Sequence, residues 1–180
     1  MIKTTSSERF TFRNAEAADV DAIVALVQSA YRGDDSRKGW TTEADLLDGQ
    51  RVDSAGVEDL IVKPASRVIL MESGNDLLAC AHIARLGEAS YFGMFSVTPT
   101  RQGAGIGNAL LAEAERVARD EWNAREMQMT VIPLREELIA WYERRGYHRT
   151  GIHSPFPYGD QRFGIPKRDD LRFERLVKPL

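Results

Sequence analysis

The sequence predicts a single α+β domain: a central mixed β-sheet of about seven strands with helices on both faces. Three observations predict this fold. The chain has 180 residues, 43% of them hydrophobic and 28% charged, which suits one globular domain with a sizeable core. Short segments with strand periodicity are interspersed with longer segments that carry one apolar face. A hairpin signal and a strand–helix–strand crossover both occur, so we expect antiparallel and parallel pairs together rather than a doubly wound sheet.

The first elements are a strand and a helix. Residues 10–13 alternate between apolar and polar side chains, as a half-buried strand does. Asn14 is suited to cap the following helix, and Gly33 is suited to end it. After a polar loop, residues 40–47 predict a short helix, because a threonine and an aspartate stand at capping-box spacing. This helix pair and its polar loop either shape a substrate pocket or form a mobile surface hairpin, and the sequence favours neither alternative.

A hairpin follows and contains the single cysteine. Residues 67–73 and 77–85 are apolar strands joined by Gly-Asn-Asp, which favours a turn. With only Cys80 present, no internal disulfide can form, and the residue resembles small core filler. His82 lies in the same strand, where a core-lining or edge histidine is a more frequent outcome than a catalytic base.

A strand, a glycine loop and a helix form the centre of the chain. The apolar strand at 91–97 ends before Pro99, which cannot donate to a β-ladder. Three alternating glycines follow, and without Cβ atoms they let backbone N–H groups converge and a ligand come close. The helix expected over 105–121 begins with unpaired amides at the positive end of its dipole. We therefore expect an anion site, most naturally for phosphate.

Three phosphate-binding patterns compete for this loop. A P-loop fails because Asn108 and Ala109 stand where glycine and lysine are required. A dinucleotide fingerprint is weak because Asn108 again replaces its third glycine. The pattern Gln/Arg-x-x-Gly-x-Gly/Ala is met by Gln102-Gly103-Ala104-Gly105-Ile106-Gly107. A tight turn without a ligand would also explain the glycines, so the choice depends on the rest of the chain.

The segment 127–132 is a strand that follows the crossover helix and ends at Pro133. It should lie parallel to the strand at 91–97. We expect these two strands to splay apart where Thr98 and Pro99 interrupt their pairing.

The C-terminal region adds a helix and two strands. Residues 134–145 carry one apolar face, and Gly146 suits the end of that helix. A strand over 147–151 should pair with a last strand over 171–177. The segment 154–170 between them is rich in Pro, Gly and aromatic residues and is expected to fold over the domain.

A second motif selects among the interpretations of the glycine loop. Residues 137–147 resemble the segment Ala-x-x-x-Tyr-Glu-x-x-Gly-Phe/Tyr of the GNAT acetyltransferase superfamily, and the glycine loop resembles the pyrophosphate loop of the same family. The order of elements extends the resemblance over nearly the whole chain, which implies one N-acetyltransferase domain over 1–180. One departure is Arg135, since many members have an asparagine there that contacts pantetheine. Arg135 is expected to reach a CoA phosphate instead.

The resemblance implies an acyltransferase that uses acetyl-CoA as its co-substrate. The backbone of Phe95 to Val97 would bind pantetheine like an added strand, and a backbone N–H near Phe95 would polarise the thioester carbonyl. Tyr142 falls on the motif tyrosine and would protonate the departing CoA sulfur as a general acid. The cofactor-binding residues that the resemblance implies are Phe95, Ser96, Val97, Gln102, Gly103, Ala104, Gly105, Ile106, Gly107, Asn108 and Arg135.

The acceptor is expected to be a primary amine of a small molecule or a peptide. By position relative to the family fold, Tyr31, Trp40 and Glu43 would border its site, beside Arg32 and the segment 154–170. Their aromatic and acidic character favours a cationic amine. Because the thioester is already activated, we expect direct attack in a ternary complex without an acyl-enzyme.

The base that accepts the proton of the amine is not assigned by the sequence. Glu43, Glu88 and His82 are candidates, and an ordered chain of waters is an equal one. A non-catalytic acyl-CoA or ligand sensor of the same fold and a nucleotide-binding protein also remain open. The motif tyrosine and the complete glycine loop favour the enzyme.

Charge and composition restrict the expected partners, membrane segments, metals and location of the protein. The net charge is −3 with no basic block, so nucleic acid and anionic membranes are not expected as partners. The chain has no apolar run of about 18 residues, and residues 1–7 lack the apolar core of a signal peptide. No His, Cys and Asp cluster has metal-ligand spacing, so no metal is expected. We expect a cytoplasmic protein, and the resemblance is compatible with a homodimer.

Overall fold

The computed structural model describes residues 9–180. The residues on which the expectation of no signal peptide rests lie outside this range. The helices are α1 (Val20–Tyr31), α2 (Gly33–Ser36), α3 (Ser54–Val62), α4 (Ile106–Arg116) and α5 (Glu136–Glu143). The strands are β1 (Phe10–Asn14), β2 (Leu47–Asp48), β3 (Ser66–Ser73), β4 (Asp76–Leu86), β5 (Ala89–Val97), β6 (Glu126–Val131), β7 (His148–Pro155), β8 (Ile165–Pro166) and β9 (Arg172–Pro179). Short 3₁₀ turns lie at Ala17–Asp19, Pro99–Arg101 and Gln161–Phe163, and a π-helical turn, Val117–Glu121, continues α4.

Seven strands form one mixed sheet in the order β1-β3-β4-β5-β6-β9-β7, and β2 pairs with β8 separately. Only β5 and β6 run parallel among the described neighbours of the large sheet. These pairings confirm the predicted mixed sheet, the hairpin of β3 and β4, and the pairing of β7 with β9. The sequence did not predict that β9 would also pair with β6.

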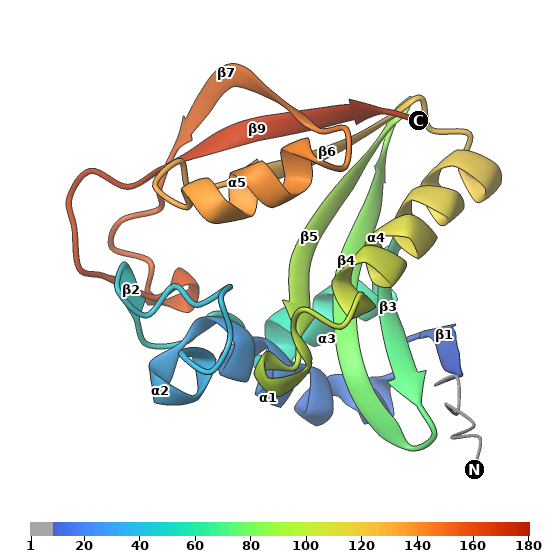
Figure 1. Ribbon diagram of the computed structural model, residues 1–180, viewed down its shortest axis with the longest axis horizontal. Helices are drawn as coiled ribbons and strands as arrows, with labels where there is room; N and C mark the ends of the chain where they lie inside the picture. The colour runs from blue at the N-terminus through green and yellow to red at the C-terminus, as the bar shows by residue number, and fades with distance from the viewer. Residues whose placement is uncertain (1–8) are drawn as a thin grey trace, which may run out of the picture.

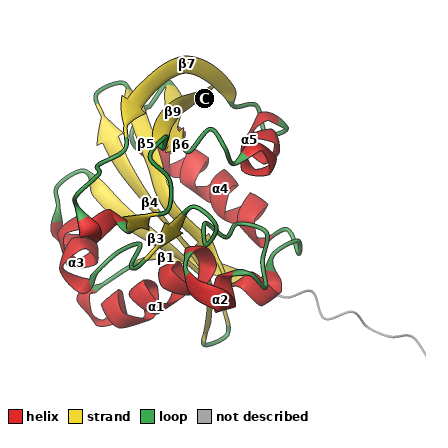
Figure 2. Ribbon diagram, turned by 90° about the vertical axis from the view of Figure 1, so that its left-hand side faces the viewer, coloured by secondary structure: helices red, strands yellow, loops and turns green. Residues whose placement is uncertain are grey.

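Helices cover both faces of the sheet (Figure 2), with α1 and α3 on one side and α4 and α5 on the other. Alternation along β3 explains the two layers, because Val68 and Leu70 pack with α1 whereas Ile69 and Met71 pack with α4. Within the described part of the chain, no helix is both long enough and apolar enough to cross a bilayer.

The parallel pair β5–β6 is hydrogen-bonded only at one end. Its register runs from Ala89 opposite Glu126 to Tyr91 opposite Gln128, and beyond this point the strands diverge (Figure 1). A β-bulge follows, in which Met94 and Phe95 together stand opposite a single residue of β4, and Met94 has a φ of 49°. The splay was predicted, but its place was wrong. It begins before the bulge rather than at the Thr98-Pro99 interruption, because the bulge bends β5 away first.

Two local predictions near the N-terminus are also wrong. Asn14 is the last residue of β1 rather than a helix cap, and Glu16 and Asp19 instead form a capping box around the 3₁₀ turn. Residues 40–47 contain turns and the start of β2 rather than a helix. Tertiary contacts explain this, because the Glu43 N–H donates to the Tyr31 carbonyl at 2.9 Å and the Thr41 carbonyl accepts from Arg135. These backbone groups are therefore engaged outside any local helix.

The segment 154–170 folds over the domain as predicted. Its strand β8 pairs with β2, and the Lys167 N–H donates to the Leu46 carbonyl at 2.9 Å. Figure 1 shows it crossing from the β7 end of the molecule to the region of α2 and β2. This crossing ties the C-terminal strands to the N-terminal helices beyond the open end of the splayed strands.

Candidate active site

Two cavities adjoin where β5 and β6 diverge. The first, of about 540 Å³, lies between the glycine loop and α5, and we call it the loop cavity. The second, of about 420 Å³, is bordered by β5, β6, the end of α1 and the segment 154–170, and we call it the inner cavity. Among the described residues, Phe95 alone lines both. The bulge of β5 therefore lies at the junction of the two cavities.

The glycines of the loop differ in the reason for their presence. Gly103 and Gly105 have φ values of 89° and 81°, which side-chain-bearing residues rarely adopt, and a Cβ at either would meet nothing within 4 Å. Gly107 has no such φ, but a Cβ there would lie 3.0 Å from the Phe95 ring. The first two glycines shape an open loop, and the third permits close packing of α4 on the bulge.

The start of α4 presents amides to the loop cavity. Gly105 is its N-cap, and the first intrahelical bond runs from the Ala109 N–H to the Gly105 carbonyl at 3.0 Å. The amides of the preceding first turn therefore remain for a ligand. This arrangement, with the positive end of the helix dipole behind it, has the chemistry of an anion site.

Two arginines that were not predicted as site residues also line the loop cavity. Arg144 and Arg145 follow Tyr142 at the end of α5. Arg145 donates from Nε to Asn108 Oδ1 at 2.9 Å and from Nη1 to the Trp141 carbonyl at 2.8 Å, and its guanidinium lies 3.5 Å from the centre of the Trp141 indole. The position of Arg144 and Arg145, two and three residues after the motif tyrosine, was the sequence signal that could have identified them.

Gln102 also lines the loop cavity, but its side-chain amide is engaged by other protein groups. Its Oε1 accepts the Trp40 N–H at 2.8 Å, and its Nε2 donates to Thr41 Oγ1 at 2.7 Å and to the Val97 carbonyl at 3.1 Å. The side chain therefore holds the segment before β2 against the glycine loop, and only its backbone remains for a ligand.

The structure distributes the other predicted site residues between the two cavities. The loop cavity is lined by Phe95, Val97, Gly103, Gly105, Gly107, Asn108 and Trp40. The inner cavity is lined by Tyr31, Glu43, Arg135 and Tyr142, together with Phe95. Three predicted residues line neither cavity: Ser96 and Ile106 are buried, and Ala104 is exposed at the tip of the loop. Arg135 thus lies away from the glycine loop.

Tyr142 lies in the wall of the inner cavity, packed edge-on against Trp141 and Tyr147 and beside Phe95. Burial raises the pKa of its phenol well above the ordinary value, so the hydroxyl keeps its proton at neutral pH. Within residues 9–180, no protein group hydrogen-bonds this hydroxyl. It is therefore available to donate to a bound molecule.

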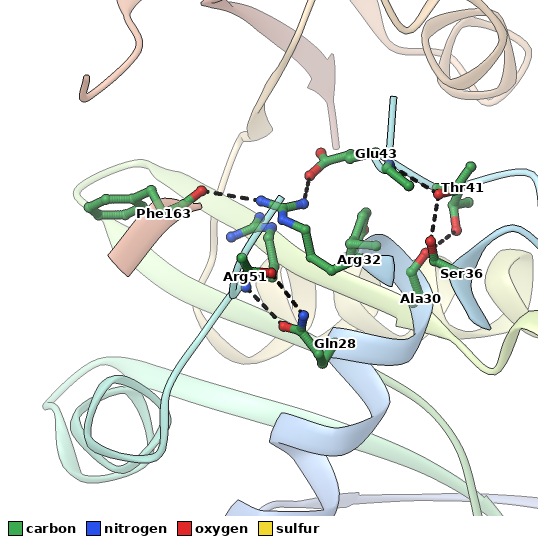
Figure 3. A network of polar contacts seen from close by, with 12 residues as sticks. Gln28, Ala30, Arg32, Ser36, Thr41, Glu43, Arg51 and Phe163 are labelled. Carbon is green, nitrogen blue, oxygen red and sulfur yellow. Dashed lines mark hydrogen bonds and ion pairs between the residues drawn. The ribbon is translucent and has the colours of Figure 1, made fainter. Parts of the chain in front are cut away.

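Among the described residues, Glu43 is the carboxylate that lines the inner cavity, and Figure 3 shows Arg32 and Arg51 close to it. Glu43 is paired with Arg32 through Oε2 and with Arg135 through Oε1, the latter at 3.0 Å. Burial alone would raise the pKa of Glu43, but the charges of Arg135, Arg51 and Arg32 outweigh it and hold the pKa below its usual range. The carboxylate is ionised and engaged, so it is a poor base.

The other two candidate bases line neither cavity. His82 is buried in β4 beside Ser66, with 2.9 Å between Nε2 and Oγ, and burial lowers its pKa to about 4. Glu88 is exposed at the turn between β4 and β5, 3.7 Å from Arg125.

Cys80 is fully buried, and burial raises the pKa of its thiol to about 12, which makes it a poor nucleophile. In the part of the chain that the structure describes, no group of three or more His, Cys, Asp or Glu residues is placed to hold a metal.

The chain is similar in sequence to a known family and to one of its members. The sequence model of the acetyltransferase (GNAT) family matches residues 21–147. A mycothiol acetyltransferase of Salinispora tropica is 32% identical over 145 residues, covering 79% of this chain but only 45% of that protein. This chain therefore spans about half the length of that relative.

Solved structures share the fold at low sequence identity. The ribosomal-protein-S18-alanine N-acetyltransferase of Escherichia coli superposes with a TM-score of 0.70 at 14% identity, over 95% of this chain and 94% of that one. An N-acetyltransferase of Staphylococcus aureus Mu50 superposes with a TM-score of 0.71 at 13% identity, over 95% and 97%. Identities this low establish likeness of fold alone.

Proposed function

Because the chain belongs to the GNAT acetyltransferase family, we propose that it transfers an acetyl group from acetyl-CoA to a primary amine. The observation that carries the proposal is the meeting of two cavities at Phe95. One has the features of an anion site, and the other contains a protonated phenol. A cofactor with a phosphate-rich end and a reactive thioester at the other end fits this arrangement.

The loop cavity would take the phosphate-bearing end of acetyl-CoA. The open turn at Gly103 and Gly105 and the first-turn amides of α4 supply hydrogen-bond donors. Arg144 and Arg145 supply positive charge from the facing helix. We assign Arg135 to the inner cavity instead of to a CoA phosphate, because Glu43 and the Thr41 carbonyl already engage its guanidinium.

The diverging edge of β5 would take the pantetheine arm. Pairing with β6 stops at Tyr91, so the edge of β5 beyond Tyr91 is open to an added extended ligand, apart from the Phe95 and Val97 carbonyls, which already accept hydrogen bonds from side chains. The bulge would turn a backbone N–H near Phe95 toward the thioester carbonyl, where it stabilises the developing oxyanion. One such donor is worth about 2.7–4 kcal/mol in related acyl-transfer sites.

The phenol of Tyr142 would complete the reaction. The amine attacks the thioester carbonyl directly, and the carbon–sulfur bond breaks as the tetrahedral species collapses. Tyr142 donates its proton to the departing sulfur. Because Glu43 is engaged by arginines and His82 lies outside the cavity, we assign the proton of the amine to a water relay.

The proposal also covers the cellular compartment, the partners and the oligomeric state. We infer that the protein acts in the cytoplasm on a small-molecule or peptide amine, without a nucleic-acid or membrane partner, and that it is able to form a homodimer. The single cysteine and the absence of a basic block support the first two points.

A thiol-release assay tests the proposed function. Purified protein is mixed with acetyl-CoA and a panel of primary amines, and free CoA is followed over time. We expect amine-dependent release, together with thermal stabilisation by CoA but not by ATP or NAD. Stabilisation by CoA without release for any amine would favour an acyl-CoA sensor. Equal stabilisation by ATP would contradict the assignment of the loop cavity.

A further inference from the structure

The inner cavity carries an excess of positive charge. Arg32, Arg51 and Arg135 line it together with one carboxylate, Glu43, and no other Asp or Glu among the described residues belongs to its lining. Three arginines against one glutamate leave a formal excess of two positive charges. A cationic amine was expected from the acidic residue, but the arginines neutralise that residue, so this expectation loses its basis.

The pairing of Glu43 is complete. Each of its oxygens is held by a different arginine, and the side chain is almost fully buried. Arg135 is also fixed by the Thr41 carbonyl and lies 5.5 Å from the centre of the Tyr31 ring. The charges of Glu43 and Arg135 are therefore already paired within the protein.

Two arginines of the cluster have N–H donors without a partner in the described structure. Arg32 has a side chain that is 1% exposed, and its Nε has no hydrogen-bond partner within residues 9–180. Leaving a buried charged donor unpaired is costly, and such groups are normally satisfied. Arg51 makes no hydrogen bond or ion pair through its side chain in the described structure, and its guanidinium lies 5.4 Å from the centre of the Tyr31 ring.

The backbone that carries Arg51 is held in place. Gln28 of α1 accepts the Arg51 N–H at 3.0 Å and donates to the Gly49 carbonyl at 3.0 Å. Figure 3 shows the Arg51 side chain beside the guanidinium of Arg32. Two like charges side by side in a partly buried site repel each other, so an anion between them would be strongly favoured.

We propose that Arg51 and the Nε of Arg32 form a carboxylate subsite, so that the acceptor is a small amine that also carries a carboxylate. This inference rests on the proposed acetyl transfer and names the acceptor class for it. A cavity of about 420 Å³ has room for an amino-acid-sized molecule. The carboxylate would lie at the arginines, and the amine would point toward Phe95 and Tyr142 in the same cavity.

Matched acceptors test the subsite. Acetyl transfer is measured at saturating acetyl-CoA with a panel of α-, β- and γ-amino acids and with their carboxamides, which differ only in the charge of that group. The wild type should prefer the carboxylates by at least about tenfold in kcat/KM. In Arg51→Gln this preference should fall by at least about tenfold, mainly through KM. Arg125→Gln, a change at an exposed arginine far from the cavity, should keep the wild-type preference.

A binding measurement keeps the test independent of turnover. Thermal unfolding is followed with CoA present and N-acetyl amino acids or N-acetyl amino acid amides added. Larger stabilisation by the carboxylates, lost in Arg51→Gln, supports the subsite. Equal stabilisation by both series overturns it. Equal transfer to amino acids and their amides also overturns the subsite, and so does transfer confined to peptide N-termini. Both results leave the proposed acetyl transfer intact. Absence of CoA release with every amine contradicts the proposed function instead.

Discussion

The hydroxyl of Tyr31, at the end of α1, donates a hydrogen bond to the main-chain carbonyl of Phe95 in the bulge of β5. Both residues are buried, and both line the inner cavity. The bond joins the helix that carries the acceptor-side residues to the strand segment at which the two cavities meet. The shape of the bulge therefore depends on α1 as well as on the sheet.

Removing this bond should affect both stability and catalysis. Tyr31→Phe leaves a buried carbonyl without its partner, which should lower the free energy of unfolding by about 1–3 kcal/mol. Because the bulge is then less well fixed, kcat should fall more than the affinity for CoA. Tyr147→Phe is a matched control, since its hydroxyl bonds Glu115 outside both cavities, and it should lose stability while keeping kcat. Equal effects of the two variants on kcat would count against the role of the bulge.

The charge of Arg145 should matter only for ligands that carry phosphate. Arg145→Gln removes a cation from the loop cavity and its bond to Asn108, so CoA should bind about tenfold more weakly. S-acetylpantetheine, which has no phosphate, should show little difference between wild type and variant. Titration calorimetry at low salt measures both. If the loss is the same for the two ligands, Arg145 does not contact the phosphates.

Two glycine substitutions separate loop shape from packing. In Gly105→Ala the φ of 81° becomes strained, which should cost about 1–2 kcal/mol of stability and weaken CoA binding. In Gly107→Ala a gain of up to about 1 kcal/mol in helix propensity opposes a clash with Phe95, so stability should change little. The displaced ring should nevertheless lower kcat. Chemical denaturation and steady-state kinetics on both variants measure the contrast, and a kcat for Gly107→Ala equal to wild type would refute the packing role.

The buried histidine predicts how stability depends on pH. Burial, with a smaller contribution from the charge of Lys63, lowers the pKa of His82 to about 4, whereas an unfolded chain has a value of about 6.5. Between these values the unfolded state binds a proton that the folded state does not, so stability falls as the pH drops from about 6.5 to about 4. The difference between the two pKa values corresponds to a total loss of about 3 kcal/mol. Urea denaturation of wild type and His82→Gln should show a flatter profile for the variant, and identical slopes would contradict this assignment.

The sequence predicted those parts of the site that depend on local pattern. The glycine loop and Tyr142 each belong to a short motif, and the parallel crossover brings the helices that carry them to one edge of β5. The fold followed from the same periodicities, except where a helix lacks a one-sided apolar pattern. Helix α3 buries only Val57 completely, so its sequence gave little signal.

The arginine cluster could not be predicted in this way. Glu43 and Arg135 are 92 residues apart in the chain. They meet because the segment before β2, which carries Glu43 and is held to the glycine loop by Gln102, lies beside the residues that follow β6. In the sequence, Glu43 has the appearance of an unpaired acidic residue. Only the tertiary structure shows that its charge is exceeded by that of its neighbours.

We propose that Tyr142 gives its proton to the sulfur that leaves when acetyl-CoA reacts in the inner cavity. Tyr142→Phe removes only the hydroxyl and keeps the ring contacts with Phe95, Trp141 and Tyr147. The most direct test is the single-turnover rate of acetyl transfer in this variant, with the CoA affinity measured on the same preparation. We predict a rate at least about 100-fold below wild type with the affinity for CoA nearly unchanged. A rate equal to that of the wild type would contradict the account.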